Sequence, residues 1–268
     1  LQQIPARNAI LGPMIRSIFI PEEDCQWGIF DYSQQEPRLV VHYAALTGSS
    51  TGGLPGATEF AEAYSTDPGT DFHTLVSDMA GIDRKQAKTI NLGLFYGMGK
   101  GKLMSQLGLN LEDASDLLAT YHERVPFVKQ LMNRTMASAG KKGFLRTLLG
   151  RRCRFDLWEP TNEWGSKALP LAEAQREYGE HMIKRAWTYK SLNRLIQGSA
   201  ADQTKKAMVE LHKEGFIAHI QVHDELDFSI ASQKDSHRIQ EIMETCVELL
   251  VPSKVDVELG SSWGDAGK

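Results

Sequence analysis

The stretch Asp31-Tyr32-Ser33-Gln34-Gln35-Glu36-Pro37-Arg38 follows a short apolar run that begins at Trp27. Far along the chain, His223-Asp224-Glu225 lies between two further apolar runs, 217–222 and 226–230. Runs of this length predict strands, so we expect each acidic cluster at the end of a strand. Carboxylates that converge from distant segments can hold a pair of Mg²⁺ ions, the arrangement that transfers phosphoryl or nucleotidyl groups. Either cluster alone would also fit a turn or a helix cap.

The composition excludes several classes of protein. With 268 residues, 41% of them hydrophobic, the chain can bury a substantial core in one large domain or two subdomains. Its three cysteines are far apart and form no CxxC pair, which argues against a zinc site or a disulfide framework. No apolar run is long enough to span a membrane, and the first residues do not resemble a signal peptide. The chain begins without methionine, so we expect a fragment, a processed product or one half of a split protein.

The distribution of charge is more informative than its sum. The formal net charge is −4, which by itself gives no sign of nucleic-acid binding. A basic stripe nevertheless runs from 141 to 154 without an acidic residue; its cations are Lys141, Lys142, Arg146, Arg151, Arg152 and Arg154. Such a stripe can bind a phosphate backbone, although a solvated basic loop is an equally good reading of it alone.

Apolar periodicity and turn residues predict a mixed α+β chain. Strands are expected at 27–32, 217–222, 226–230 and 255–259, and helices from 33 to 46, over 72–142, over 171–211 in one or two pieces, and over 233–250. The segments 47–71 and 155–170 are rich in Gly, Ser, Thr, Pro or Trp and are predicted to be loops.

One predicted helix carries a pattern of its own. Arg84, Lys88, Leu92 and Tyr96 are four residues apart, so a helix places them along one face. Two cations at this spacing repel each other slightly, which is tolerated if an anion such as a triphosphate binds between them. A solvated basic face with a core tyrosine is the alternative.

These motifs, taken together, resemble DNA polymerase family A, the bacterial DNA polymerase I type. The segment from Asp31 to Arg38 is similar to motif A of that family, Arg84…Lys88…Tyr96-Gly97 to motif B, and 221–225 to motif C. Further similarities are at 1–8, at Asn193…Gln197-Gly198 and at 255–263. Departures from the family pattern suggest a divergent phage- or organelle-like member.

The resemblance implies a right-hand polymerase fold. The expected divisions are a first part of an antiparallel-sheet palm at 1–46, a loop insertion at 47–71, mostly helical fingers at 72–155, and at 156–268 the remaining fingers helices with the return to the palm. No segment corresponds to a thumb, so we expect an N-terminal thumb and exonuclease region or a separate chain as a partner.

The resemblance also implies a reaction: template-directed addition of a dNTP to a primer 3′-hydroxyl, with release of pyrophosphate. Asp31 and Asp224 would hold two Mg²⁺ ions, for which Mn²⁺ can substitute. The backbone carbonyl of Tyr32 would join them, and Glu225 would be a weaker ligand. Lys88 would be a third catalytic residue that protonates the departing pyrophosphate.

Substrate contacts follow from the same resemblance. The expected dNTP-binding residues are Gln34, Glu36, His73, Arg84, Lys88, Leu92 and Tyr96. Among them, Glu36 would lie under the sugar and exclude a 2′-hydroxyl. The expected DNA-binding residues are Arg7, Gly97, Arg151, Arg152, Asn193, Gln197 and His223. Side-chain donors such as Arg7 and Gln197 can reach minor-groove acceptors that all base pairs share, which tests pair geometry without reading sequence.

Leu92 departs from the family, whose members usually carry Phe or Tyr there. An aliphatic side chain presents no aromatic face or hydroxyl near the sugar, so analogue discrimination is not carried over. Gln35 and Pro37 replace residues that are usually aliphatic, and Pro37 is tolerated in a first helical turn.

Three other readings stay open. A non-catalytic replisome subunit would be expected to lose a metal carboxylate, yet Asp31 and Asp224 are both present. A two-metal nuclease or cyclase would not need the Arg84/Lys88/Tyr96 helix. Reverse transcription within the same family is compatible with every motif. For the predicted polymerase we expect a location in the cytoplasm of a bacterial or phage-infected cell, or in an organelle, without membrane association.

Overall fold

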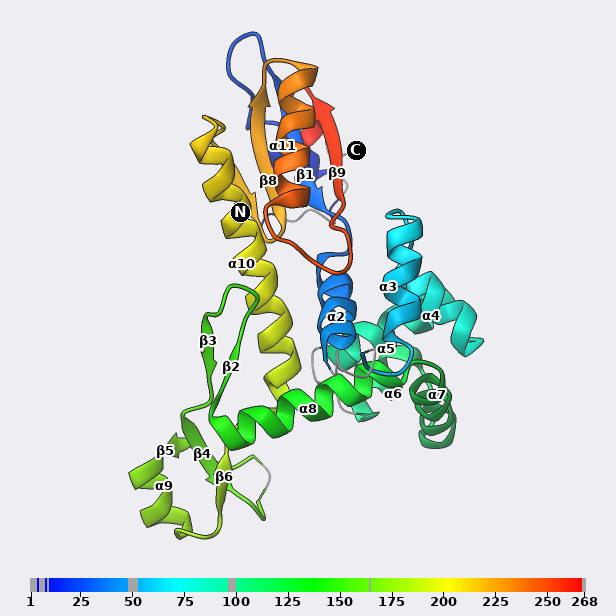
Figure 1. Cartoon of the computed structure of the whole chain (residues 1–268), viewed down its shortest axis with the longest axis vertical. Helices are drawn as coiled ribbons and strands as arrows, with labels where there is room; N and C mark the ends of the chain where they lie inside the picture. The colour runs from blue at the N-terminus through cyan, green and yellow to red at the C-terminus, as the bar shows by residue number, and fades with distance from the viewer. Residues whose placement is uncertain are drawn as a thin grey trace. The chain divides into compact units, whose positions relative to one another are not determined.

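The computed structural model describes residues 4, 8, 10–47, 53–95, 100–163 and 165–266. The chain divides into two compact units, whose elements are labelled in Figure 1. Unit 1 comprises Leu1–Arg38, Tyr64–Gly69 and Ala200–Lys268, and unit 2 comprises Leu39–Ala63 and Thr70–Ser199. All paired strands are antiparallel, and the predicted mixture of helices with antiparallel sheet is confirmed.

Unit 1 is built on a four-stranded sheet with the strand order β7-β8-β1-β9. The strands are β1 (Gln26–Tyr32), β7 (Ile220–Val222), β8 (Glu225–Ile230) and β9 (Val255–Gly260). Three of the four predicted strands are confirmed to within one residue at each end, and the fourth is shorter than predicted. The strand that carries Asp31 is therefore central, with β8 and β9 as its direct neighbours.

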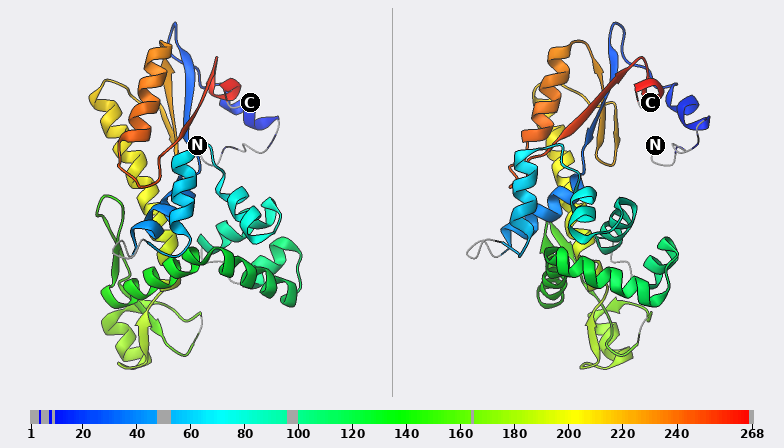
Figure 2. Two further views of the ribbon diagram at one scale, coloured as in Figure 1. Left: turned by 45° about the vertical axis from the view of Figure 1, so that its right-hand side comes forward. Right: turned by 90° about the vertical axis from the view of Figure 1, so that its right-hand side faces the viewer.

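The alternation of side chains along β1 gives the sheet two covered faces. Phe30 and Tyr32 point into a core formed with α11 (Gln233–Thr245) and with the part of α10 (Ser191–Lys213) that follows Ala200. Trp27 and Ile29 point to the opposite face, which Trp263 of the short α12 (Trp263–Ala266) covers together with residues near α1 (Leu11–Arg16). Figure 2 shows these helices on opposite sides of the sheet. Asp31 shares the second face.

Unit 2 is mostly helical. It includes α4 (Phe72–Ala80), α5 (Arg84–Phe95), α6 (Lys100–Leu107), α7 (Leu111–Arg124) and α8 (Pro126–Lys142). Their centre is aromatic: the ring centroid of Phe60 lies 5.3 Å from that of Phe72 and 5.0 Å from that of Phe127. Phe95 lies 5.9 Å from Phe72, so side chains from four segments pack as one cluster.

The loop predicted for 47–71 is wrong in its second half, which contains α3 (Ala57–Thr66). Phe60 and Tyr64 stand one helical turn apart and are both buried, so their burial stabilises a helix that the Gly- and Ser-rich flanks conceal. Helix α2 (Gln35–Leu46) precedes the segment as predicted.

The loop predicted for 155–170 is also wrong, because it contains β4 (Leu157–Pro160) and β5 (Leu169–Pro170). Between α9 (Leu171–Tyr178) and α10, a third strand, β6 (Ile183–Arg185), and a 3₁₀ turn, η2 (Thr188–Lys190), divide the predicted helical stretch. Trp158 pairs across the strands with Arg185, whose guanidinium lies 4.6 Å from the indole ring. The residue pattern within one segment does not reveal cross-strand pairs of this kind.

The basic stripe forms a hairpin of β2 (Phe144–Arg146) and β3 (Arg152–Arg154). It lies against the first turns of α10 at Gly198, where an added Cβ would be 2.8 Å from Thr147 Cγ2. Glycine is therefore needed there for close approach of the hairpin to the helix. Among the described helices, none is long and apolar enough to cross a membrane.

Candidate functional site

Three carboxylates form a row across unit 1. Asp31 on β1 lies directly opposite Glu225 on β8 and directly opposite Asp256 on β9. Residues paired in this way share one face of a sheet, here the face that also carries Trp27 and Ile29. Like charges that stand opposite each other on neighbouring strands destabilise a sheet, and a bound cation would relieve that repulsion.

The turn that carries Asp224 is tied to the end of β1. The Tyr32 N–H donates to the Asp224 backbone oxygen at 3.5 Å, a long contact that continues the β1–β8 ladder. His223, just before Asp224, has a left-handed φ of +58°, a conformation in which His is found more often than most residues. The two acidic motifs predicted to converge therefore meet within unit 1.

The environment of Asp31 disfavours its charge. Desolvation, followed by repulsion from Asp224, Glu225 and Asp256, raises the pKa of Asp31 to about 7. The residue as a whole is exposed, so the carboxyl group is partly enclosed but still reachable from solvent. A divalent cation would remove the repulsion that raises this pKa.

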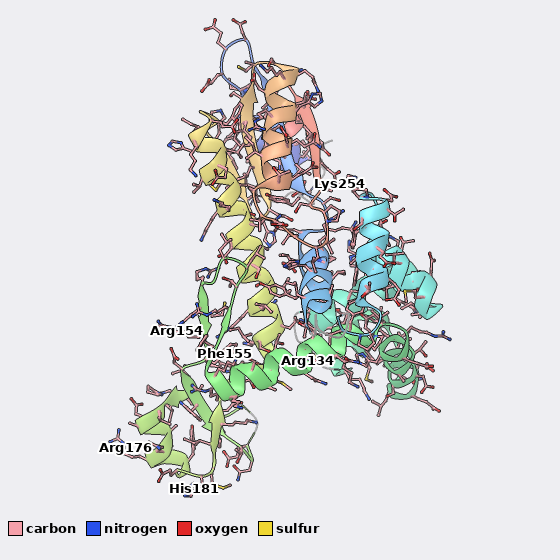
Figure 3. The ribbon with its side chains drawn as sticks, in the orientation of Figure 1. Arg134, Arg154, Phe155, Arg176, His181 and Lys254 are labelled. Carbon is pink, nitrogen blue, oxygen red and sulfur yellow. The ribbon has the colours of Figure 1, made fainter. Side chains whose placement is uncertain are left out.

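One further acid, Asp227, lies beside this row next to Glu225. Glu225 Oε1 accepts a hydrogen bond from Trp263 Nε1 at 3.0 Å, and burial raises the pKa of Glu225. Asp227 is fully buried, and burial together with the neighbouring Glu225 raises its pKa to about 8. Asp256 is more open and pairs with Lys254, the labelled residue before β9 in Figure 3, at 3.2 Å. The sequence reasoning missed Asp256, because only strand register places it next to Asp31.

Motif A continues into α2, whose first turn carries Glu36. Glu36 is 8% exposed, and His223 Nε2 lies 3.8 Å from its Oε1. His223 Nδ1 lies 2.8 Å from Asp224 Oδ1, and this hydrogen bond is the largest contribution that raises the pKa of His223. Gln34 has a left-handed φ of +54° and accepts a hydrogen bond from Tyr64 Oη at 3.3 Å. Contacts through His223 thus link Glu36 to Asp224, whereas Gln34 contacts Tyr64.

The donor set suits Mg²⁺. Among the described residues, no three His, Cys, Asp or Glu side chains gather closely enough to hold one metal ion. A cation held by Asp31 and Asp224 would therefore rest on two carboxylates and backbone oxygens, with substrate and water in the remaining positions. Mg²⁺ is typically bound in proteins by one or two carboxylates together with phosphates and water.

The second set of predicted residues lies in unit 2, on α5. Arg84 and Lys88 are exposed and Leu92 is half-buried, whereas Ala87, Ile90 and Asn91 on the opposite face are buried. The described part of the predicted stripe, Arg84, Lys88 and Leu92, therefore lies on one face of α5. Asp83 begins the helix by accepting hydrogen bonds from the N–H groups of residues 85 and 86.

Arg84 is not free in this structure. Its Nη2 lies 2.8 Å from Asp71 Oδ2, and Asp71 also caps α4 by accepting from the Thr74 N–H at 2.7 Å. Burial raises the pKa of Asp71, but the hydrogen bonds from Arg84 and Thr74 outweigh it, so this pKa lies below its ordinary value. A triphosphate on Arg84 would compete with Asp71.

His73 lies on α4 in the same unit and is largely buried. Its Nδ1 is 3.0 Å from Asn91 Nδ2, and Tyr121 Oη donates to Asn91 Oδ1 at 2.6 Å. Desolvation lowers the pKa of His73, as do the charges of Lys88 and Arg84, while Asp71 acts in the opposite direction. The sequence reasoning missed Asn91 and Tyr121; a polar residue on the buried face of α5 was the available signal.

The predicted DNA contacts of unit 2 lie on α10 and the hairpin. Asn193 and Gln197 are one turn apart on α10, half-buried and exposed respectively. Arg151 and Arg152 are exposed on the hairpin, although Arg151 Nη2 also donates to the Gly198 carbonyl at 2.8 Å. Arg154 and Phe155, labelled in Figure 3, mark the end of the hairpin, where Arg194 stacks over Phe155 at 4.8 Å. The other predicted residues, Arg7, Tyr96 and Gly97, lie outside the described residues.

Comparison with known proteins decides the family. The sequence profile of DNA polymerase family A matches residues 1–265. This chain belongs to DNA polymerase family A. The resemblance predicted from motifs A, B and C is therefore confirmed.

Individual relatives agree with the family assignment. A "DNA-directed DNA polymerase" of Pseudomonas phage M6 is 41% identical over 98% of this chain and 42% of its own length. The "DNA polymerase I" of Pseudomonas aeruginosa is 32% identical over 99% of this chain and 28% of its own length. The chain thus spans less than half the length of these family A relatives.

A solved structure shares the fold. It is described as "POL domain of Pol1 from M. smegmatis complex with DNA primer-template and dNTP" and has a TM-score of 0.76 at 29% identity. The similarity covers 100% of this chain and 45% of that chain. The fold of this chain is therefore similar to that of a family A POL domain.

Proposed function

We propose that this chain carries the nucleotidyl-transfer centre of a template-directed DNA polymerase, as part of a larger or split protein. The observation that carries the proposal is the meeting of the two acidic motifs: Tyr32 N–H binds the Asp224 carbonyl, and Asp31 stands opposite Glu225. Family A membership and a relative solved with primer-template and dNTP support the same reaction.

In this proposal, Asp31, Asp224 and the backbone carbonyl of Tyr32 would hold two Mg²⁺ ions, with Glu225 as a weaker ligand. When bound, the metal supplies acidity at the primer 3′-hydroxyl and neutralises charge on the phosphates. Burial and then repulsion from neighbouring carboxylates raise the pKa of Asp31, and a cation there would relieve that repulsion. Trp263 orients Glu225 by its indole N–H, which fits a lesser role for that carboxylate.

The triphosphate of the incoming dNTP would bind the exposed stripe of α5. Arg84 and Lys88 would contact phosphate oxygens, and His73 would add a neutral hydrogen bond. Arg84 must then exchange its ion pair with Asp71 for the phosphates; because that pair is exposed, its loss costs little. Lys88, which is exposed and lies one turn from Arg84, would also be the acid for the departing pyrophosphate.

Sugar and base would be selected by residues from motifs A and B. Glu36, with Gln34 beside it, would occupy the space under the sugar, so that a 2′-hydroxyl is excluded. The low exposure of Glu36 and the approach of His223 to it support a fixed carboxylate rather than a mobile one. Leu92 and Tyr96 would contact the sugar and the base.

Primer-template DNA would be bound by Arg7, Gly97, Arg151, Arg152, Asn193, Gln197 and His223. The position of Asn193 and Gln197 one turn apart on α10 supports this, because two side-chain amides on one helix face can reach neighbouring minor-groove acceptors. We further propose that unit 1 is the palm and that unit 2 contains the fingers, with a thumb and an exonuclease region supplied by the rest of the protein.

Primer extension tests the proposed function. Wild type, Asp224→Ala and Asp256→Asn are each given saturating primer-template, Mg²⁺ and dNTPs. We expect extension by the wild type, loss of extension in Asp224→Ala, and retention in Asp256→Asn, because Asp256 contributes charge to the row but is not a proposed ligand. Extension by Asp224→Ala would contradict the metal assignment, and its absence from the wild type would contradict the activity.

A further inference from the structure

A buried hydrogen-bond chain in unit 2 links three helices. It runs from Tyr121 on α7, through Asn91 on α5, to His73 on α4, with distances of 2.6 Å and 3.0 Å. Tyr121 and Asn91 are 0% exposed and His73 is 7% exposed. Water cannot substitute freely for any partner in such a chain, so the direction of each hydrogen bond is determined by the groups themselves.

Tyr121 sets the orientation of the Asn91 amide. Burial raises the pKa of Tyr121, so the phenol keeps its proton. A buried hydroxyl proton needs an acceptor, and among the described residues the one that the Tyr121 hydroxyl reaches is Asn91 Oδ1. The amide oxygen therefore faces Tyr121, and the amide nitrogen faces His73.

Asn91 in turn sets the tautomer of His73. An amide nitrogen can only donate a hydrogen bond, so His73 Nδ1 must accept and cannot carry a proton. Burial lowers the pKa of His73, which keeps the ring neutral. A neutral imidazole without a proton on Nδ1 carries it on Nε2. No described residue hydrogen-bonds to that nitrogen.

We propose that Tyr121 and Asn91 are positioning residues that hold His73 as a neutral ring with its proton on Nε2, where it donates to the triphosphate of the incoming dNTP. This use of the Nε2 proton rests on the proposed function. Arg84 and Lys88 supply positive charge on the neighbouring helix, and His73 adds a directed donor without adding a third cation. The position of the proton that would contact the phosphate therefore depends on the buried hydrogen bonds between α4, α5 and α7.

Nitrogen NMR of the full chain labelled with ¹⁵N-histidine tests the tautomer without reference to activity. The chain has eight histidines, and the signals lost in His73→Gln identify those of His73. We expect the shift of an unprotonated nitrogen at Nδ1 and of a protonated nitrogen at Nε2. The opposite pattern, or a doubly protonated ring at neutral pH, would overturn the inference.

Two variants test the direction of control. Asn91→Asp replaces the donor with a carboxylate that can only accept, so we expect the His73 proton to appear on Nδ1. Tyr121→Phe frees the amide to rotate, so the two His73 nitrogens should shift toward each other. Tyr43→Phe is the matched control. It also removes a partly buried tyrosine hydroxyl, which lies 2.7 Å from Ser199 Oγ and takes no part in the Tyr121–Asn91–His73 hydrogen bonds. If Asn91→Asp leaves the His73 signals as in the wild type, Asn91 does not set the tautomer.

A titration with dTTP and Mg²⁺ tests the phosphate contact separately. We expect the His73 Nε2 signal to shift on binding in the wild type, and Tyr121→Phe to raise the KM for dTTP about threefold with little change in kcat, roughly the effect of weakening one hydrogen bond. An unmoved Nε2 signal on saturation would overturn the contact even if the tautomer is as inferred. If neither wild type nor any variant extends primers, the proposed function fails. The tautomer assignment still stands if the His73 signals show an unprotonated Nδ1 and a protonated Nε2.

Discussion

Arg38 is a buried cation whose donors all reach backbone carbonyls of unit 1. It is 2% exposed, and its guanidinium donates to Ser33 O at 2.8 Å, Pro252 O at 2.6 Å and Pro68 O at 2.5 Å. The Tyr64 ring stacks on it at 4.4 Å. One side chain thereby fixes the start of α2, where motif A ends, to two loops distant in sequence.

Arg38→Lys should destabilise the protein although it conserves the charge. An ammonium donates from one nitrogen and cannot reach three carbonyls that are bound by three separate guanidinium nitrogens, so part of this buried set loses its partner. We expect a decrease of about 2–4 kcal/mol in the free energy of unfolding, measured by urea denaturation. Arg134→Lys on the exposed side of α8 is the control and should cost less than about 0.5 kcal/mol. Equal losses in the two variants would contradict the role of Arg38.

Leu92 is the residue at which family A behaviour is not transferable. It is half-buried on the α5 face that carries Arg84 and Lys88. Leu92→Phe should alter the rate of dNTP incorporation and the acceptance of dideoxynucleotides without abolishing activity, because it changes contacts with the sugar and not the metal ligands. Single-turnover incorporation of dNTP and ddNTP by both proteins measures this. Identical rates for both substrates would show that position 92 does not contact the sugar.

At the scale of the element, Asp71 joins α4 to α5. One carboxylate oxygen caps α4 through the Thr74 N–H, and the other binds Arg84. The pKa of Asp71 is depressed, so its stabilising contribution is complete above the ordinary value of 3.8 and is lost as the pH falls below it.

Asp71→Ala should cost about 1 kcal/mol at pH 7, a typical value for an N-cap, and less at pH 3. Urea denaturation at the two pH values measures the change. Asp71→Asn keeps a capping side chain but cannot titrate, so its difference from Asp71→Ala should be the same at both pH values. If the difference in free energy of unfolding between wild type and Asp71→Ala is as large at pH 3 as at pH 7, the stabilising role of the ionised Asp71 carboxylate is contradicted.

The elements that sequence predicted well are those whose burial is local. The local order of apolar and polar residues indicates both strand β1 and helix α5, so the sequence placed both elements correctly. Strands β4 to β6 were missed because Trp158 and Arg185 stabilise each other only after the strands pair. Helix α3 was hidden by the Gly- and Ser-rich residues that precede it.

At the scale of the whole molecule, the sequence identified the family through the order of three motifs, and the comparisons confirmed it. It also predicted that Asp31 and Asp224 would converge, since each was expected at the end of a strand and the family resemblance implied a shared metal site. It could not place Asp256 beside Asp31, because strand order and register are non-local. Nor could it supply the Tyr121–Asn91–His73 chain, which depends on the packing of three helices.

The proposed function requires Asp31 and Asp224 to act as one metal-dependent centre. The most direct test is the rate of single-nucleotide incorporation, at fixed Mg²⁺ and saturating primer-template, for wild type, Asp31→Asn, Asp224→Asn and the double variant. If both carboxylates serve the same metals, each single variant should lose about 10³-fold or more, and the double variant should be little worse than either. Losses that multiply in the double variant, or a single variant that keeps near wild-type rates, would contradict a shared centre.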